Sequence, residues 1–211
     1  MSGVERQLAS PSTPAFAPTA LLWCIRTRKY LDDLGRSDEL LVDDLAADLV
    51  AFVSETMPGS IMRGLPRSEW HGTGKPDDAI RALADANTAR RFERVVSKLG
   101  AVGSIPRDGW RLGGDALYQG SILKAPAVLQ AFANRAGGDV ILAVPDRTLV
   151  LAIPQSTEGL RSFRHRVNQA FREAMAPCSD ALLITDGATV RALEVTPSHR
   201  RSGGFMEWLR D

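Results

Sequence analysis

The chain has 211 residues, of which 44% are hydrophobic, 24% are charged and 6% are aromatic, and its formal net charge is +1. This composition is typical of a globular protein and excludes wholesale disorder. The strongly apolar runs reach only about six residues, whereas a membrane-spanning helix needs about twenty, so we expect no membrane span. The N-terminus lacks the apolar core of a secretory signal. Two cysteines, Cys24 and Cys178, are too few for a disulfide framework, so we expect a reduced, cytoplasmic protein.

The first part of the sequence predicts a flexible arm and then a helical region. Residues 1–18 are rich in proline and serine and favour a flexible arm. We predict that residues 19–100 are mainly helical, beginning with a helix over residues 19–35. Charge is uneven here, because residues 1–60 carry a net −4 and residues 61–135 a net +5. Either the two parts pack together or the basic part is a surface for an anionic partner.

The strongest helical pattern follows Ser37, whose hydroxyl can cap a helix. Pro58-Gly59 would end this helix near Met57. Its apolar residues recur at three- and four-residue spacing, namely Leu41, Leu45, Leu49, Phe52 and Val53. Glycine and proline then predict a loop over residues 58–75. A further helix is predicted from Pro76 to Leu99, and Asn87-Thr88 is the point where it would break in two.

The remaining sequence, residues 101–197, predicts an α+β domain. A glycine-rich segment leads to a short helix over residues 125–135. From residue 139, Val/Ile/Leu-rich strands with short turns predict an antiparallel hairpin, and a helix over residues 157–175 follows. A second hairpin turns at Asp186-Gly187. We therefore predict a β-β-α-β-β unit, that is, a mostly antiparallel sheet covered by helix.

Several short segments of this unit have a recognisable sequence. Residues 138–146 read Gly-Asp-Val-Ile-Leu-Ala-Val-Pro-Asp, and residues 149–152 read Leu-Val-Leu-Ala. After the helix, residues 177–182 read Pro-Cys-Ser-Asp-Ala-Leu, and residues 185–187 read Thr-Asp-Gly. In these segments the C-terminal third resembles the YtpQ-like family of uncharacterised bacterial proteins. The resemblance implies a shared fold and brings no catalytic residues, because that family has no established activity.

Motifs for common chemistries are missing from the sequence. Gly72-Thr73-Gly74-Lys75 lacks the other residues of a phosphate-binding loop. His71, His165 and His199 have no further ligands at metal-binding spacing, so we expect no metal and no cofactor. Cys178 is a nucleophile only if a base such as His165 lies within hydrogen-bond reach, and a buried, inert thiol is the alternative. An enzyme of unrecognised type thus remains an open alternative.

Two predicted helices carry basic faces. These faces contain Arg90, Arg94 and Lys98 on one helix and Arg161, Arg164 and Arg172 on the other. Such faces can neutralise nucleic-acid phosphates, although a charge stripe is usually only a solvated surface. Nucleic-acid binding is therefore our alternative hypothesis.

The tail, residues 198–211, predicts a contact with a protein partner. Phe205, Trp208 and Leu209 share one face of a short helical segment after a glycine-containing linker. Large apolar groups on such a segment either dock on their own domain or enter the groove of a partner. Our main hypothesis is a non-catalytic, cytoplasmic binding or adaptor protein, with these three residues as the partner-binding candidates.

Overall fold

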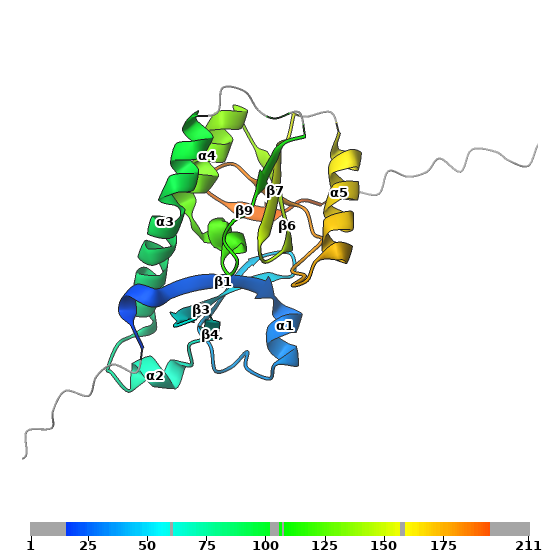
Figure 1. The fold of residues 1–211 in the computed structure, drawn as a ribbon. Coiled ribbons are helices and arrows are strands. Elements are labelled where there is room, and N and C mark those ends of the chain that lie inside the picture. The colour runs from blue at the N-terminus through cyan, green and yellow to red at the C-terminus, as the bar shows by residue number, and fades with distance from the viewer. Residues whose placement is uncertain (1–15, 60, 102–105, 107, 157–158, 195–211) are drawn as a thin grey trace, which may run out of the picture.

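The computed structural model describes residues 16–59, 61–101, 106, 108–156 and 159–194. It contains two antiparallel sheets and five α-helices among these residues, so the predicted α+β class is confirmed (Figure 1). The strands are β1 (Leu21–Thr27), β2 (Val42–Ala46), β3 (Leu49–Met57), β4 (Ile61–Gly64), β5 (Trp110–Leu112), β6 (Val140–Asp146), β7 (Leu149–Pro154), β8 (Leu183–Thr185) and β9 (Val190–Ala192). The helices are α1 (Arg28–Asp33), α2 (Arg67–His71), α3 (Asp77–Ala101), α4 (Pro126–Ala136) and α5 (Leu160–Glu173), with 3₁₀ turns η1 (Pro18–Ala20) and η2 (Gln119–Lys124).

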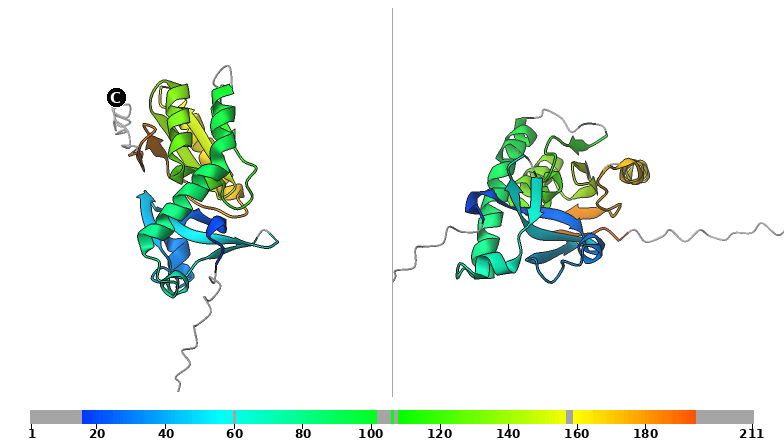
Figure 2. Two further views of the ribbon diagram at one scale, coloured as in Figure 1. Left: turned by 90° about the vertical axis from the view of Figure 1, so that its left-hand side faces the viewer. Right: turned by 60° about the horizontal axis from the view of Figure 1, so that its bottom comes forward.

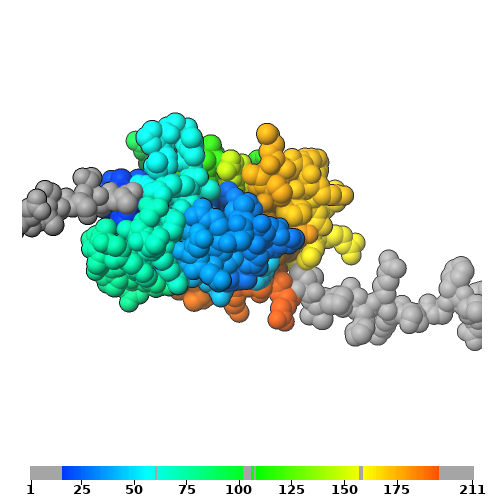
Figure 3. Space-filling model, turned by 90° about the horizontal axis from the view of Figure 1, so that it is seen from below, coloured from blue at the N-terminus to red at the C-terminus, as the bar shows by residue number. Residues whose placement is uncertain are grey.

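The predicted helices over residues 19–35 and 37–57 are wrong, because most of this region forms the first sheet. Its central strand is β3, which pairs with β1 on one side and with β2 and then β4 on the other. β3 and β4 form a hairpin that projects from the body of the molecule (Figure 2). In the space-filling view from below, α1, α2 and this hairpin form the near surface (Figure 3).

The continuous burial of β1 and β3 explains why the helix prediction fails for this region. In β3 the seven residues from Leu49 to Glu55 are all buried, and in β1 the six residues from Leu21 to Arg26 are buried. A surface helix buries only one stripe, whereas a strand covered on both faces buries every residue. Leu41, Leu45 and Leu49 match a helical repeat, but Ala47 has a φ of 54° and turns the chain between β2 and β3.

Two smaller predictions for this region are also wrong. The loop predicted over residues 58–75 contains β4 and α2. Helix α3 is continuous through Asn87-Thr88 and runs alongside both sheets (Figure 1). The arm predicted over residues 1–18 is described only from Phe16, whose side chain is 4% exposed and belongs to the core.

The polar residues that predicted a helix break instead cover the free edge of β1. The hydroxyl of Thr88 accepts a hydrogen bond from the Trp23 N–H at 3.1 Å. The Asn87 amide donates to the Leu21 carbonyl at 3.0 Å, and the Ser121 hydroxyl of η2 donates to the Trp23 carbonyl at 2.5 Å. An exposed edge would offer these backbone groups to another chain. Side chains of α3 and η2 thus complete the sheet and join the two halves of the molecule.

The second sheet has the strand order β5-β7-β6-β8-β9, with every pair antiparallel. Strands β6 and β7 form one hairpin and β8 and β9 another, close to where the sequence predicted two hairpins. Pro145-Asp146, predicted as a turn, lies within β6, and the turn falls at Arg147-Thr148. The helix predicted over residues 125–135 is α4, which ends at Gly137 with a φ of 71°.

Helices cover both faces of this sheet. Val140, Leu142 and Val144 of β6 pack into the main core, which also contains residues of α3 and α4. The alternate residues Ile141 and Ala143 pack in a second cluster with Phe163 and Val167 of α5. Helix α5 therefore lies on the opposite face from α3 and α4, and Figure 1 shows this arrangement.

Candidate functional site

A cleft of about 780 Å³ opens beside α5, where that helix passes the β6–β7 turn and strand β5. Its cationic residues are Arg111 from β5, Arg147 from the β6–β7 turn and Arg166 from α5. The other lining residues include Asp146, Leu149, Leu151, Gln169, Ala170, Glu173 and Met175. We call this site the arginine cleft. It combines three guanidinium groups with an apolar floor.

Local structure explains how each arginine reaches the cleft. In β5, Trp110 is buried and Arg111 is exposed, because successive side chains of a strand point to opposite faces. Arg147 follows β6 in the turn to β7. On α5, Arg166 follows Phe163 by three residues, and its guanidinium lies over the Phe163 ring at 5.5 Å from the ring centre. The apolar stripe of α5 thus anchors the helix and holds this cation beside the sheet.

These arginines have no ion-pair partners in the described parts of the chain. None of the three forms an ion pair there, and the Nε atoms of Arg147 and Arg166 are shielded from solvent without a hydrogen-bond partner. A buried donor left without a partner costs about 1–3 kcal/mol, and more when it is charged. Guanidinium groups match carboxylate and phosphate oxygens in geometry as well as charge. An oxyanion in the cleft would pair with these guanidinium groups through their terminal nitrogens.

The two acids of the cleft already have hydrogen-bond donors. The Asp146 carboxylate accepts from the Thr148 N–H at 2.7 Å, from the Thr148 hydroxyl at 2.8 Å and from the Ala176 N–H at 3.0 Å. Burial raises the pKa of Asp146, but these hydrogen bonds and the charge of Arg147 outweigh it and hold the pKa below its usual range. Glu173 accepts a hydrogen bond from the Gln169 amide at 2.9 Å. The cleft is therefore lined by two acids that already accept hydrogen bonds and by three arginines that form no ion pair among the described residues.

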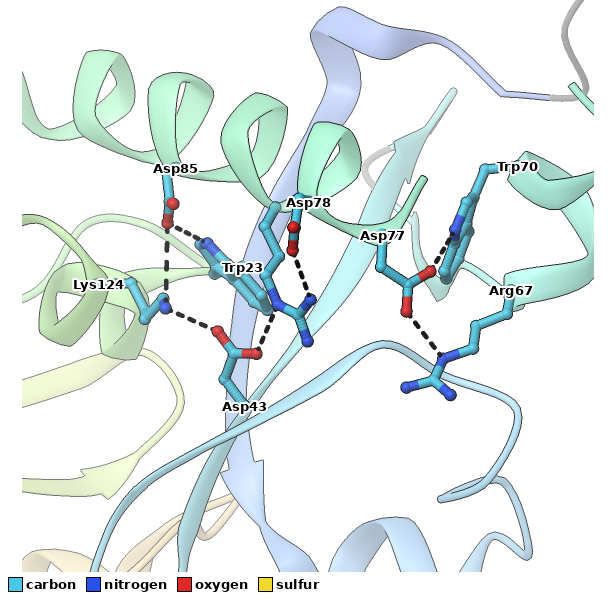
Figure 4. Close-up of polar contacts among 9 residues, drawn as sticks. Trp23, Asp43, Arg67, Trp70, Asp77, Asp78, Asp85 and Lys124 are labelled. Carbon is cyan, nitrogen blue, oxygen red and sulfur yellow. Dashed lines mark hydrogen bonds and ion pairs between the residues drawn. The ribbon is translucent and has the colours of Figure 1, made fainter. Parts of the chain in front are cut away.

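A second polar cluster joins the two halves of the molecule (Figure 4). The Lys124 ammonium lies 3.0 Å from the Asp43 carboxylate and 4.3 Å from the centre of the Trp23 ring. Asp43 also binds Arg81 at 3.0 Å, and Asp85 accepts from the Trp23 indole N–H at 2.6 Å. Because each charged group here has a partner, the cluster is explained as a link between β1, β2, α3 and η2.

The residues considered for catalysis lie in separate places. Cys178 is 4% exposed, and burial raises the pKa of its thiol to about 12. His165 is exposed on α5, and no hydrogen bond joins the two residues in the described chain. His71 binds Asp77 at 3.0 Å near the first sheet, and this hydrogen bond is the largest cause that lowers the pKa of Asp77. The geometry therefore gives Cys178 no activating base.

The two predicted basic faces are exposed but do not meet. Residues Arg90, Arg94 and Lys98 are exposed on α3, and Arg161, Arg164 and Arg172 are exposed on α5. Since α3 and α5 cover opposite faces of the second sheet, the six residues do not form one surface. The α5 group lies on the helix that also carries Arg166 of the arginine cleft.

The partner-binding candidates Phe205, Trp208 and Leu209 lie outside the described residues. Sequence reasoning missed the arginine cleft itself. Arg111 and Arg147 are isolated in the sequence, and only the pairing of β5 with β7 brings them together. Arg166 was not among the basic residues singled out on its helix, and its place three residues after Phe163 of the apolar stripe was the available signal that it lies near the sheet.

Comparisons with known proteins do not identify a family for this chain. No family model matches the sequence, and neither a curated protein nor a solved structure matches it. In the part of the chain that the structure describes, no helix has the length and apolar character needed to cross a membrane.

Proposed function

We propose that this protein acts by binding, and that the arginine cleft receives an acidic segment of a partner protein. The observation that carries the proposal is that Arg111, Arg147 and Arg166 line one cleft without an ion pair among the described residues, and that the Nε atoms of two of them have no hydrogen-bond partner there. Carboxylates would supply the acceptors. The apolar floor, formed by Leu149, Leu151 and Ala170, would accommodate an apolar side chain next to the acid. A cytoplasmic location and kinship with the YtpQ-like family remain part of this proposal.

A pair of labelled peptides tests the proposal. Fluorescence anisotropy would compare the peptide Glu-Glu-Trp-Leu-Glu-Glu with Lys-Lys-Trp-Leu-Lys-Lys, each carrying fluorescein. We expect the protein to bind the glutamate peptide only. The double variant Arg147→Gln, Arg166→Gln should weaken binding at least tenfold, because each charge-assisted hydrogen bond contributes about 1.5–3 kcal/mol.

Arg161→Gln is the matched control, because Arg161 is exposed on the same helix but does not line the cleft. Its affinity for the glutamate peptide should equal that of the wild type. The proposal is wrong if the wild type binds neither peptide, or if Arg161→Gln weakens binding as much as the double variant does. Thermal melting of each variant verifies that the fold is intact.

Nucleic-acid binding is the second candidate function. It is favoured by the exposed Arg161, Arg164 and Arg172, which have no ion pair among the described residues, on a helix whose single acid is Glu173. The double variant Arg164→Glu, Arg172→Glu should abolish salt-sensitive retention on DNA or RNA. Retention that is unchanged by these substitutions would exclude α5 as the binding surface.

A further inference from the structure

We propose that the segment of this chain from Phe205 to Asp211 occupies the arginine cleft in the same molecule and competes there with the partner. This inference rests on the proposed function, because it assigns a regulatory occupant to the same site. The segment lies outside the described residues, so the argument starts from where the described chain ends and from the chemistry of the cleft.

The described chain ends on the face of the sheet that carries the cleft. Leu193, just after β9, donates its N–H to the Leu182 carbonyl at 2.8 Å and packs against the cluster that contains Phe163 and Val167. Ala170 packs against the same cluster and lines the cleft. The chain therefore leaves the described structure on the α5 side of the second sheet.

The distance along this face is within reach. Helix α5 has 14 residues, and at about 1.5 Å per residue it is about 21 Å long, while β7 lies three strand spacings from β9, or about 14 Å at roughly 4.8 Å each. The eleven steps from Glu194 to Phe205 span up to about 36 Å when extended, at roughly 3.3 Å per residue. The linker Ser202-Gly203-Gly204 imposes little conformational restriction. The segment can reach any position along α5 without unfolding the domain.

The chemistry of the segment complements that of the cleft. Phe205, Trp208 and Leu209 supply large apolar side chains, and Glu207 and Asp211 supply carboxylates, so that with Arg210 the segment carries a net charge of −1. In the cleft, Leu149 and Leu151 form an apolar floor below unpaired guanidinium groups. Met175 also lines the cleft, and its side chain is fully exposed. Carboxylates of the segment would pair with Arg147 and Arg166, and an aromatic ring of the segment would contact Met175.

A spin label in the full-length chain tests this arrangement. The variant Gly204→Cys, labelled with a nitroxide, places the label next to the segment, while the buried Cys24 and Cys178 remain unlabelled. We expect broadening of the amide NMR signals of Leu149, Leu151 and Gln169. The control Lys75→Cys carries the same label at an exposed position between α2 and α3, and it should leave these signals sharp. Adding Trp208→Ala, or Arg147→Gln with Arg166→Gln, should abolish the broadening.

Mixing distinguishes the same molecule from a second copy. An isotope-labelled wild-type chain is mixed with an unlabelled chain that carries the spin label at Gly204→Cys. The proposal predicts sharp signals in the mixture, and broadening of the wild-type signals there would assign the segment to a second copy and overturn it. Absence of broadening in the singly labelled chain would also overturn it.

The acidic peptide separates failure of this inference from failure of the proposed function. If the segment fills the cleft half of the time, the apparent Kd for the glutamate peptide is raised about twofold, and Trp208→Ala should remove this effect. Equal affinities for the wild type and Trp208→Ala, without broadening, would refute the inference and leave the proposed function standing. Broadening in the wild type, together with no binding of the acidic peptide by either the wild type or Trp208→Ala, would support placing the segment in the cleft and refute the proposed function.

Discussion

At the scale of single residues, burial determines the chemistry of the two cysteines. Desolvation raises the pKa of Cys24 to about 11 and that of Cys178 to about 12. At pH 8 about one Cys24 thiol in a thousand is then ionised, and the thiolate is the reactive form. We predict no reaction with an aromatic disulfide reagent in the native protein and two reactive thiols in denaturant. Rapid labelling of one thiol in the native state would contradict this account.

Asp146 makes stability depend on pH. Because the pKa of its carboxyl is lowered on folding, the charged form stabilises the native protein above the pKa of the unfolded chain, and this contribution is lost as the pH falls through the folded pKa. Asp146→Asn should therefore reduce the free energy of unfolding most at neutral pH, and the difference from the wild type should shrink below about pH 4. Urea unfolding of the wild type and of Asp146→Asn at pH 7, 5 and 3 measures this difference in the free energy of unfolding. A difference that becomes larger as the pH falls would contradict a lowered pKa for Asp146 in the folded protein.

At the scale of elements, the edge of β1 depends on side chains rather than on another strand. Thr88→Val keeps the shape of the side chain but leaves the Trp23 N–H without its acceptor, so we predict a loss of about 1–3 kcal/mol in the free energy of unfolding. Ser97→Ala, at an exposed position of the same helix, is the control and should change it by less than about 0.5 kcal/mol. Equal effects of the two substitutions would show that this hydrogen bond contributes little.

The elements also show what the sequence can and cannot predict. Pro126 and Gly137 mark the ends of α4 by local rules, and Asp186-Gly187 marks a turn in which Gly187 has a φ of 96°. The region 37–57 was mispredicted because a buried strand and a helix can both contain leucines four residues apart. Local periodicity does not reveal that a strand will be covered on both faces. That information lies in the pairing of β3 with its neighbours.

At the scale of the whole molecule, the candidate site results from topology. Arg111, Arg147 and Arg166 lie on β5, on a turn and on α5, and no local pattern links them. The pairing of β5 with β7 and the return of α5 across the sheet bring them together. By contrast, Asp43, Arg81 and Lys124 also converge from distant segments but neutralise one another. The unpaired cations distinguish the arginine cleft from a structural network.

The central claim is that the guanidinium groups of the arginine cleft bind an acidic ligand. The most direct measurement is an NMR titration that follows the Nε–Hε signals of arginine while the glutamate peptide is added. The account predicts that the signals of Arg147 and Arg166 shift together and saturate, whereas that of Arg161 stays in place. Equal, unsaturated shifts of all three signals, or no shift at Arg147 and Arg166, would contradict it.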